Sequence, residues 1–470
     1  MELGTPIRPA VLLPGESRSD KSIGTPFDQS ARVLNGRKHG LCHNYRQVIV
    51  QLCLAALIGI SLRLVLLPQA LHEKKGRKAD FLIYFGVAKA IFGAVGGSLA
   101  DRFGRKRVCL GGWLMGIIMV PALLLAIWWD SQPLEHVADV LLGCHQGITW
   151  GVNIISVMDL LGPSGRGMGS ALSNATGYCF SAFTAHLAAW MVAETGVELP
   201  VAALTVALML GLALLLGLSE ETVRWAHNEG ADGACNSRLD YCPNRAGSMS
   251  WLQRFSCGSG EQGLCSLAGL TINLATGVVW GAAVLWAKDE HEGGLNVYEI
   301  GNMEAAHTYG KVMAMLIAGV SMYSLRPQSV VVISLTILSV GIGLTALQAS
   351  HPPAETISFM ASLGLIGVGV GGAFPALAAA VSATAPESHR ASVYGGYRFW
   401  RDLGYAVGGV ATHVFDWDGF RSITKVVFLW AVTVTFIVWL QFGFCVVDKS
   451  KKSSDEADEL MGHELPTVGS

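Results

Sequence analysis

Apolar runs of about 20 residues recur along almost the whole chain, with short polar turns between them, and each run is long enough to cross a membrane as a helix. We therefore predict twelve membrane-spanning helices. They are expected at residues 47–69, 80–100, 108–129, 137–161, 168–193, 199–219, 264–287, 297–322, 328–349, 356–382, 391–414 and 426–446. The pattern predicts an all-α membrane protein with six spans on each side of one long polar interruption.

The polar stretches divide the chain into five predicted parts. Residues 1–46 form a polar N-terminal tail, 47–220 a first six-helix bundle, 221–263 an inter-bundle loop, 264–447 a second six-helix bundle and 448–470 a mixed-charge C-terminal tail. The N-terminal tail lacks the apolar core of a signal peptide and contains acidic residues, which a mitochondrial transit peptide avoids.

Composition excludes several classes of protein. The chain is 51% hydrophobic and only 14% charged, which is too little charge for a water-soluble protein of 470 residues. Its net charge of −2, with no basic run interleaved with aromatic residues, excludes a nucleic-acid binder. Cys235, Cys242 and Cys257 lack zinc-site spacing, so we expect free thiols and no metal or cofactor.

Lysine and arginine counts predict the orientation of the spans. With the N-terminus inside, cytoplasmic segments hold 21 of these residues and outer loops hold 7. This bias predicts that both termini are cytoplasmic. The first outer loop opposes it, with Lys74, Lys75, Arg77 and Lys78. The sequence leaves open whether the protein is in the plasma membrane or an internal one.

The turn between the second and third spans, residues 97–106, reads Gly-Ser-Leu-Ala-Asp-Arg-Phe-Gly-Arg-Lys. It resembles the G-x-x-x-D-R-x-G-R-K signature of the major facilitator superfamily, through Gly97, Asp101, Arg102, Gly104, Arg105 and Lys106. The resemblance covers about residues 47–447. It implies two pseudo-symmetric six-helix bundles, a substrate site at the midplane between them and transport by alternating access.

The same resemblance implies a role for the signature turn. Asp101 would form an inter-helix lock with Arg102 and Arg105 that closes the inner gate, and Asp159 could take one of these arginines as its partner. The simpler alternative is that these charges lie in water at helix ends and only fix the topology.

Weak internal correspondence supports a parallel repeat of the two halves. Matching residues at offsets of 222 to 227 are Lys89 with Lys311, Gly97 with Gly319, Pro163 with Pro386, Arg166 with Arg390 and Tyr178 with Tyr405. The turn at 322–327 is a degenerate copy of the signature. Residues 158–163 and 397–405 further resemble a prokaryote-like facilitator group to which we assign no substrate.

A group of ionisable residues falls in the middle of predicted spans, where each charge costs about 2.5–3.5 kcal/mol on insertion scales. The group consists of Lys89, Glu304, His307, Lys311, Arg398, Arg401 and Asp402. Four cations face two carboxylates, so the surplus predicts a bound anion. Lys89 and Lys311 are the expected counter-charges, and Arg398 or Arg401 would offer a planar fork to a carboxylate or phosphate.

Other interpretations of these charges stay open. Arg398 and Asp402, at i and i+4, could neutralise each other on one helix. One lysine could be neutral while the cavity is empty. Glu304, His307 and Asp402 are candidates for proton coupling. Arg63, in the outer third of the first span, is expected to extend its charged end to the membrane surface.

The predicted function is secondary transport of a small anion, with proton coupling as an additional hypothesis, by a monomer that is not an enzyme. One alternative is a polyspecific exporter of lipophilic compounds, whose cavity would be lined by Trp150, Tyr178, Trp280, Tyr397 and Trp400. Another is a receptor or scaffold that keeps the fold without transporting. Beyond the substrate, the lipid bilayer and protons, no partner is expected.

Overall fold

The computed structural model describes residues 39–72, 79–225, 260–289, 294–350, 356–385, 389–414 and 419–462, with side chains to residue 442 in the last range. Most of the predicted N-terminal tail and inter-bundle loop, the C-terminal tail side chains, the four basic residues of the first outer loop and the three loop cysteines lie outside this description.

The first half of the described chain contains six long helices. They are α2 (Leu41–His72), α3 (Asp80–Phe103), α4 (Arg105–Trp129), α5 (Gln132–Leu161), α6 (Arg166–Thr195) and α7 (Glu198–Gly217). A short 3₁₀ turn, η1 (Pro163–Gly165), precedes α6. Several of these helices are longer than the predicted apolar runs; α2, for example, begins at Leu41, with a break in helical geometry at Asn44.

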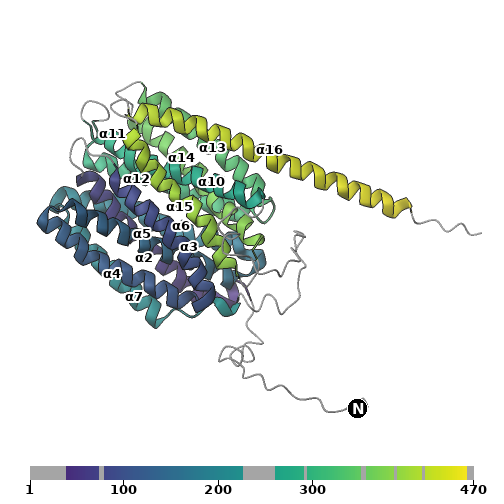
Figure 1. Ribbon diagram of the computed structural model, residues 1–470, viewed down its shortest axis with the longest axis horizontal. Coiled ribbons are helices and arrows are strands. Elements are labelled where there is room, and N and C mark those ends of the chain that lie inside the picture. Colours follow the sequence, from purple (N-terminus) through teal and green to yellow (C-terminus); the bar gives the residue numbers. More distant parts are fainter. Residues whose placement is uncertain are drawn as a thin grey trace, which may run out of the picture. The chain divides into compact units, whose positions relative to one another are not determined.

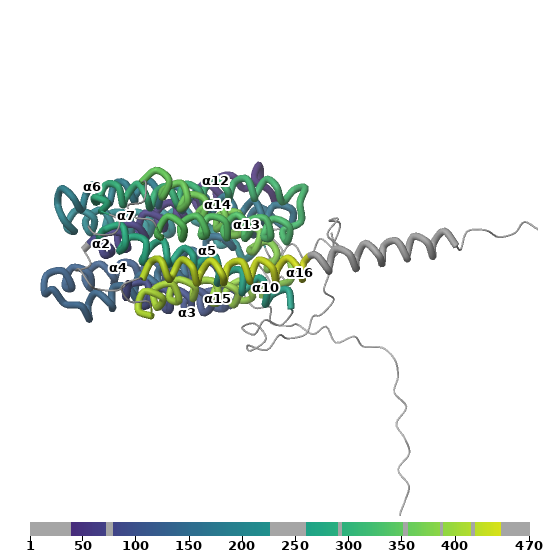
Figure 2. The backbone as a smooth tube through the Cα atoms, turned by 90° about the horizontal axis from the view of Figure 1, so that it is seen from above, coloured from purple at the N-terminus to yellow at the C-terminus, as the bar shows by residue number. Residues whose placement is uncertain are grey.

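The second half begins with a composite helix made of α10 (Gly260–Val278), the π-helical segment η2 (Val279–Ala283) and α11 (Val284–Lys288). It continues with α12 (Val297–Ser321), α13 (Pro327–Ala349), α14 (Thr356–Ala383), α15 (Arg390–Val414) and α16 (Gly419–Gly462). Each predicted span thus falls on a helix of the described chain, and Figures 1 and 2 show these helices packed together as a bundle.

Nine stretches of the described helices are long and apolar enough to cross a membrane. The three long helices that do not reach this threshold are α6, α12 and α15. Their interiors are more polar: α12 carries Glu304, His307 and Lys311, and α15 carries Arg398 and Asp402, all of them buried. A helix too polar to face lipid must cover its polar residues with protein, so these helices lie against other helices.

The two halves meet through two helix pairs. In the described chain α3 packs along α15, as Figures 1 and 2 show, and α6 packs along α12. Small residues allow the close approach: a Cβ on Gly97 of α3 would collide with the Ala391 carbonyl of α15, and one on Gly319 of α12 would press on Ala171 of α6. The middle of α3 and of α12, where Lys89 and Lys311 lie, therefore faces the opposite half.

Candidate functional site

Lys89 is buried in the middle of α3, with 2% of its surface exposed. Its ammonium lies over three aromatic rings, 4.8 Å from the ring centroid of Tyr405, 4.9 Å from Phe85 and 5.5 Å from Trp150. Within the described residues, it has neither a hydrogen bond nor a carboxylate partner. Ring faces attract a cation, but they do not neutralise its charge.

Lys311 is fully buried in α12 and has a similar environment. Its ammonium lies 4.9 Å from the ring centroid of Trp280 and 5.0 Å from Tyr178, and it donates a 3.1 Å hydrogen bond to the Thr276 hydroxyl. It too has no carboxylate in contact among the residues that the structure describes. The sequence repeat that aligns Lys89 with Lys311 therefore corresponds to two cations in matching surroundings.

The two lysines cross between the halves. Lys89 belongs to the first half and contacts Tyr405 of the second, whereas Lys311 belongs to the second half and contacts Tyr178 of the first. The hydroxyls of Tyr178 and Tyr405 are 3.5 Å apart, so both ammonium groups lie beside one tyrosine pair. The structure thus brings the two predicted counter-charges to the same place, at the junction of the halves.

Six buried aromatic side chains surround the lysines, and we call them the aromatic cluster: Phe85, Trp150, Tyr178, Trp280, Phe374 and Tyr405. Trp280 stacks on Tyr405 with ring centroids 5.2 Å apart and an interplanar angle of 14°. It belongs to the π-helical segment η2, a type of irregularity that is frequent at functional sites. Its indole Nε1 is buried and has no acceptor among the described residues.

Arg398 and Arg401 are buried in α15, where both contact Asp402. The shortest nitrogen-to-oxygen distances are 2.8 Å from Arg398 and 2.7 Å from Arg401. Arg398 also donates to the Gly147 carbonyl of α5 at 2.8 Å, and Asn273 donates to Asp402 at 3.1 Å. Both guanidinium groups therefore bind Asp402 within the protein.

Glu304 forms an ion pair across the halves with Arg63 of α2, at 2.7 Å. The Arg63 guanidinium also lies 4.5 Å from the Trp280 ring centroid, and only 1% of the residue is exposed. The expectation that Arg63 extends to the membrane surface is wrong, because a buried carboxylate and an aromatic face hold it inside. His307 contacts the Leu363 carbonyl through Nδ1 at 3.1 Å, and its buried Nε2 has no partner in the described chain.

The signature turn brings together three charged residues predicted for the gate. Arg105 donates to Asp101 at 2.9 Å and to Asp159 at 3.2 Å. Arg102, in contrast, is exposed and lies over the Phe103 ring at 5.2 Å, away from these carboxylates. Of the two arginines that the resemblance implied for the lock, Arg105 occupies it.

The same carboxylates tie the first half to the start of α15. Asp101 accepts hydrogen bonds from the Ser392 backbone N–H and hydroxyl, each at 2.7 Å. Asp159 accepts from Arg390 at 3.2 Å. These contacts join the two halves at the signature-turn end of the helices.

Backbone geometry and a cap position the turn. Gly104 has φ +95°, a conformation that favours glycine. Glu221, just after α7, accepts from the backbone N–H groups of Arg105 at 2.7 Å and Lys106 at 3.1 Å, as carboxylates do at helix N-termini. The Lys106 ammonium donates to the Ser219 carbonyl at 2.7 Å. Glu221 could not be identified from the sequence, since only the fold brings it to the start of α4.

Comparison with known proteins identifies the family. The family model described as Major Facilitator Superfamily matches residues 49–287 and 265–464. The chain is a member of the major facilitator superfamily. The signature turn between α3 and α4 and the twelve long helices of the described chain are consistent with this membership.

Solved structures of other facilitators share the fold at low sequence identity. The proton:xylose symporter XylE bound to 6-bromo-6-deoxy-D-glucose is 10% identical, with a TM-score of 0.67 over 85% of this chain and 96% of that one. The human organic anion transporter MFSD10 (TETRAN) is 15% identical, with a TM-score of 0.63 over 84% and 98%. A bacterial homologue of the iron transporter ferroportin is 14% identical, with a TM-score of 0.57 over 84% and 98%. No curated protein sequence matches this facilitator significantly.

The five aromatic residues predicted for a lipophilic cavity do not lie together: three belong to the aromatic cluster and two do not. Trp150, Tyr178 and Trp280 belong to the aromatic cluster around the lysines. Tyr397 is buried near Arg401, 5.7 Å from ring centroid to guanidinium carbon. Trp400 is 36% exposed and packs edge-on against Phe399, so it lies outside the cluster.

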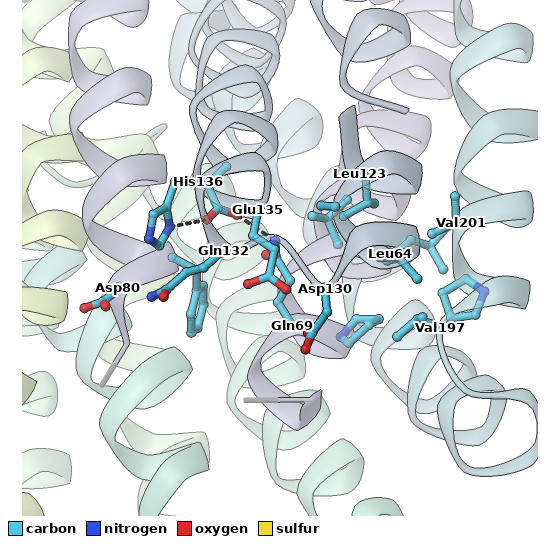
Figure 3. Close-up of a pocket in the computed structure, with 17 residues that line it drawn as sticks. Leu64, Gln69, Asp80, Leu123, Asp130, Gln132, Glu135, His136, Val197 and Val201 are labelled. Atoms are coloured by element: carbon cyan, nitrogen blue, oxygen red, sulfur yellow. Dashed lines mark hydrogen bonds and ion pairs between the residues drawn. The ribbon is translucent and has the colours of Figure 1, made fainter. Parts of the chain in front are cut away.

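A separate cavity of about 280 Å³ lies within the first half of this facilitator, at the ends of the helices opposite the signature turn (Figure 3). Its polar lining consists of Gln69, Asp80, Asp130, Gln132, Glu135, His136 and Asp139. Asp139 accepts from Gln69 at 2.7 Å and lies 3.8 Å from His136. The predicted site residues are not part of this lining, so the cavity is distinct from the lysine site.

Proposed function

We propose that this facilitator is a secondary carrier that moves a small anion by alternating access, with Lys89 and Lys311 holding the anion between the halves. The observation that carries the proposal is the pair of buried ammonium groups without carboxylate partners in the described chain. A buried charge is stable only when it is compensated, and an anionic substrate would supply the compensation.

The balance of charge in the middle of the helices supports an anion. The buried cations there are Arg63, Lys89, Lys311, Arg398 and Arg401, and the buried carboxylates are Glu304 and Asp402. Five positive groups against two negative groups leave a surplus of three. Glu304 offsets Arg63, and Asp402 offsets one of the two arginines that share it, so one surplus charge lies with Arg398, Arg401 and Asp402 and the other two lie at the lysines.

The crossed lysines suggest how an anion would be coupled to movement of the halves. Each ammonium contacts a tyrosine of the opposite half. An anion that draws both ammonium groups toward itself weakens these crossed contacts. It therefore changes the relative stability of the conformations in which the two halves are joined or apart. Opening at the signature-turn end then requires Asp101 to release Ser392, whereas opening at the other end requires Glu304 to release Arg63.

A specific contact favours proton coupling as a second part of the function. Glu304 holds Arg63 of the opposite half by charge, and a proton on the Glu304 carboxylate would remove that attraction. His307 lies on the same helix, and its Nε2 has no partner among the described residues, so it is a candidate relay. Asp402 is a poorer candidate, because two arginines and Asn273 all stabilise its charged form.

The proposal also includes a monomeric carrier with both termini in the cytoplasm, which rests on the excess of basic residues in the segments on that side. A polyspecific exporter of lipophilic compounds and a non-transporting receptor are the rival functions. They predict ligand responses different from those of an anion carrier, so one experiment separates them.

The test is thermal unfolding of the purified protein with a panel of organic anions, inorganic anions and the lipophilic cation tetraphenylphosphonium. A ligand that binds only the folded state at a hundred times its Kd stabilises it by about 2.7 kcal/mol. We expect stabilisation by anions in the wild type, loss of that stabilisation in Lys89→Gln/Lys311→Gln and no loss in Lys425→Gln. Lys425 is the matched control, because it is exposed on α16.

Three results would contradict the proposal. Anion stabilisation of equal size in the double variant would remove the lysines from the site. Stabilisation by the lipophilic cation alone, unaffected by the lysine substitutions, would favour the exporter. A protein that responds to none of these ligands would favour the receptor.

A further inference from the structure

We infer that the anion is aromatic. Its charged group lies between Lys89 and Lys311 and accepts a hydrogen bond from the indole N–H of Trp280, and its ring packs within the aromatic cluster. This inference rests on the proposed function, since it presupposes that the lysines bind an anion. It adds the chemical class of the substrate, which the lysines alone do not specify.

The first ground is what surrounds the ammonium groups. In the described chain, the ammonium groups of Lys89 and Lys311 contact five aromatic rings, those of Phe85, Trp150, Tyr178, Trp280 and Tyr405. Their one hydrogen bond there goes to the Thr276 hydroxyl. A ligand that binds here exchanges its contacts with water for contacts with aromatic faces rather than with hydroxyl or amide groups. Such walls favour a flat apolar body through stacked and edge-on contacts.

The second ground is the unused donor on Trp280. The side chain is buried with 2% exposure, yet its Nε1–H has no acceptor in the described part of the chain. A buried donor without a partner costs free energy, and an anionic oxygen of the substrate would satisfy it. Because Trp280 also contacts Lys311 and stacks on Tyr405, its donor belongs to the site of charge and aromatic contact.

The third ground is the small number of hydroxyl groups. The hydroxyls of Tyr178 and Tyr405 lie 3.5 Å from each other, and the Thr276 hydroxyl accepts from Lys311. A polyhydroxylated solute or a strongly hydrated ion such as sulfate loses many hydrogen bonds to water when it binds, and these groups cannot replace them. An aromatic anion concentrates its polarity in one group and loses less.

The experiment uses four probes that separate charge from ring. Naphthalene-2-sulfonate has both, methanesulfonate has the same charged group without the ring, sulfate is a hydrated inorganic anion, and naphthalene-2-sulfonamide has the ring with a neutral head. Binding to the full-length wild-type protein in detergent is measured by isothermal titration calorimetry and by thermal unfolding.

We expect naphthalene-2-sulfonate to bind about tenfold or more tightly than methanesulfonate, because ring contacts and apolar burial add to the same charge interaction. Sulfate and the sulfonamide are expected to bind more weakly than naphthalene-2-sulfonate. If methanesulfonate or sulfate binds as tightly, the proposed anion carrier stands and the aromatic inference is overturned. If the sulfonamide binds as tightly, or no anion binds, the anion site itself fails and the inference with it.

Variants of the cluster test where the ring lies. Tyr405→Leu is expected to reduce the preference for naphthalene-2-sulfonate over methanesulfonate about tenfold. Tyr405→Phe keeps the ring, so this variant is expected to retain most of the preference. Phe85→Leu is a second variant in case Tyr405→Leu does not fold. Phe436→Leu removes an aromatic ring that is 57% exposed on α16 and should leave the preference unchanged. An unchanged preference in both Tyr405→Leu and Phe85→Leu would overturn the inference.

Discussion

Buried charges in this facilitator are of two kinds, and they differ in how they are compensated. Asp402 is held by Arg398 and Arg401 at 2.8 Å and 2.7 Å, so each of these three charges has an opposite charge in direct contact. The Lys89 ammonium contacts three aromatic faces and has no carboxylate within ion-pair distance in the described chain. We expect the first arrangement to stabilise the fold, and we propose that the second holds a positive charge for a ligand. Substitutions at the two places should therefore change stability in opposite directions.

Asp402→Asn should destabilise the protein strongly. It leaves the guanidinium groups of Arg398 and Arg401 buried without a carboxylate, and breaking a buried charge pair in this way costs about 3–5 kcal/mol. The measurement is thermal unfolding of the purified protein without ligand. A midpoint equal to that of the wild type would contradict the view that Asp402 is the internal counter-charge.

Lys89→Met should have the opposite effect when no ligand is present. Removing a charge from the membrane interior recovers about 2.5–3.5 kcal/mol on insertion scales. A single cation–π contact is worth about 0.5–2 kcal/mol, and because the three rings share one ammonium we expect their loss to offset only part of the gain. The unliganded variant is therefore expected to unfold at a higher temperature, with Lys425→Met on the exposed face of α16 as the control. A lower midpoint for Lys89→Met would mean that the lysine contributes to the fold.

At the scale of the helices, close packing of α3 on α15 and of α6 on α12 determines where the charges meet. Gly97 lies where α3 touches the Ala391 carbonyl of α15, near the signature turn. With no side chain at this position, the two helices approach closely enough for Asp101 to reach Ser392 at 2.7 Å. The packing of α3 on α15 thus positions the residues of the proposed gate.

Gly97→Ala should weaken this contact between helices. The added methyl group has no room against the α15 backbone, and overpacking of this kind costs about 1–3 kcal/mol. Gly111→Ala on α4 is the matched control: a Cβ there meets nothing within 4 Å, so its better helix propensity should stabilise the protein by up to about 1 kcal/mol. Thermal unfolding of both variants is the measurement, and equal effects would contradict the packing role of Gly97.

The sequence predicted the elements better than the contacts between them. Apolar runs of sufficient length predict spans from local information, and the repeat of Lys89 at Lys311 predicts two matching helices. The partner of Arg63 could not be found in this way, because Glu304 is 241 residues away and only the packing of the two halves brings them together. Asp402 as partner of both arginines was partly predictable, since i and i+4 residues share a helix face.

For the whole molecule, contacts join the halves at both ends of the lysine site. At the signature-turn end, Asp101 and Asp159 bind the start of α15, and nearer the other end Arg63 binds Glu304 of α12. At the far end the Ala79 N–H donates to the Thr412 hydroxyl at 3.1 Å. Under the proposed alternating access, such an arrangement would correspond to an intermediate between two open states.

Weakening one end should open that end selectively. Asp101→Asn removes charge from the contact with Ser392 and should raise amide hydrogen exchange in residues 390–396, whereas Glu304→Gln should raise it in residues 300–308. Hydrogen exchange followed by mass spectrometry reports such local opening. If both variants loosened both ends equally, the contacts would be part of the general stability of the fold rather than two gates.

The most direct test of the central claim is uptake of naphthalene-2-sulfonate into proteoliposomes that contain the wild type, Lys89→Gln/Lys311→Gln or Lys425→Gln. The sulfonate stays ionised at all working pH values, so passive leakage is small. We predict saturable uptake by the wild type and Lys425→Gln, and only background uptake by the double lysine variant. Saturable uptake of equal rate by the double variant would contradict the claim that the two buried lysines hold the transported anion.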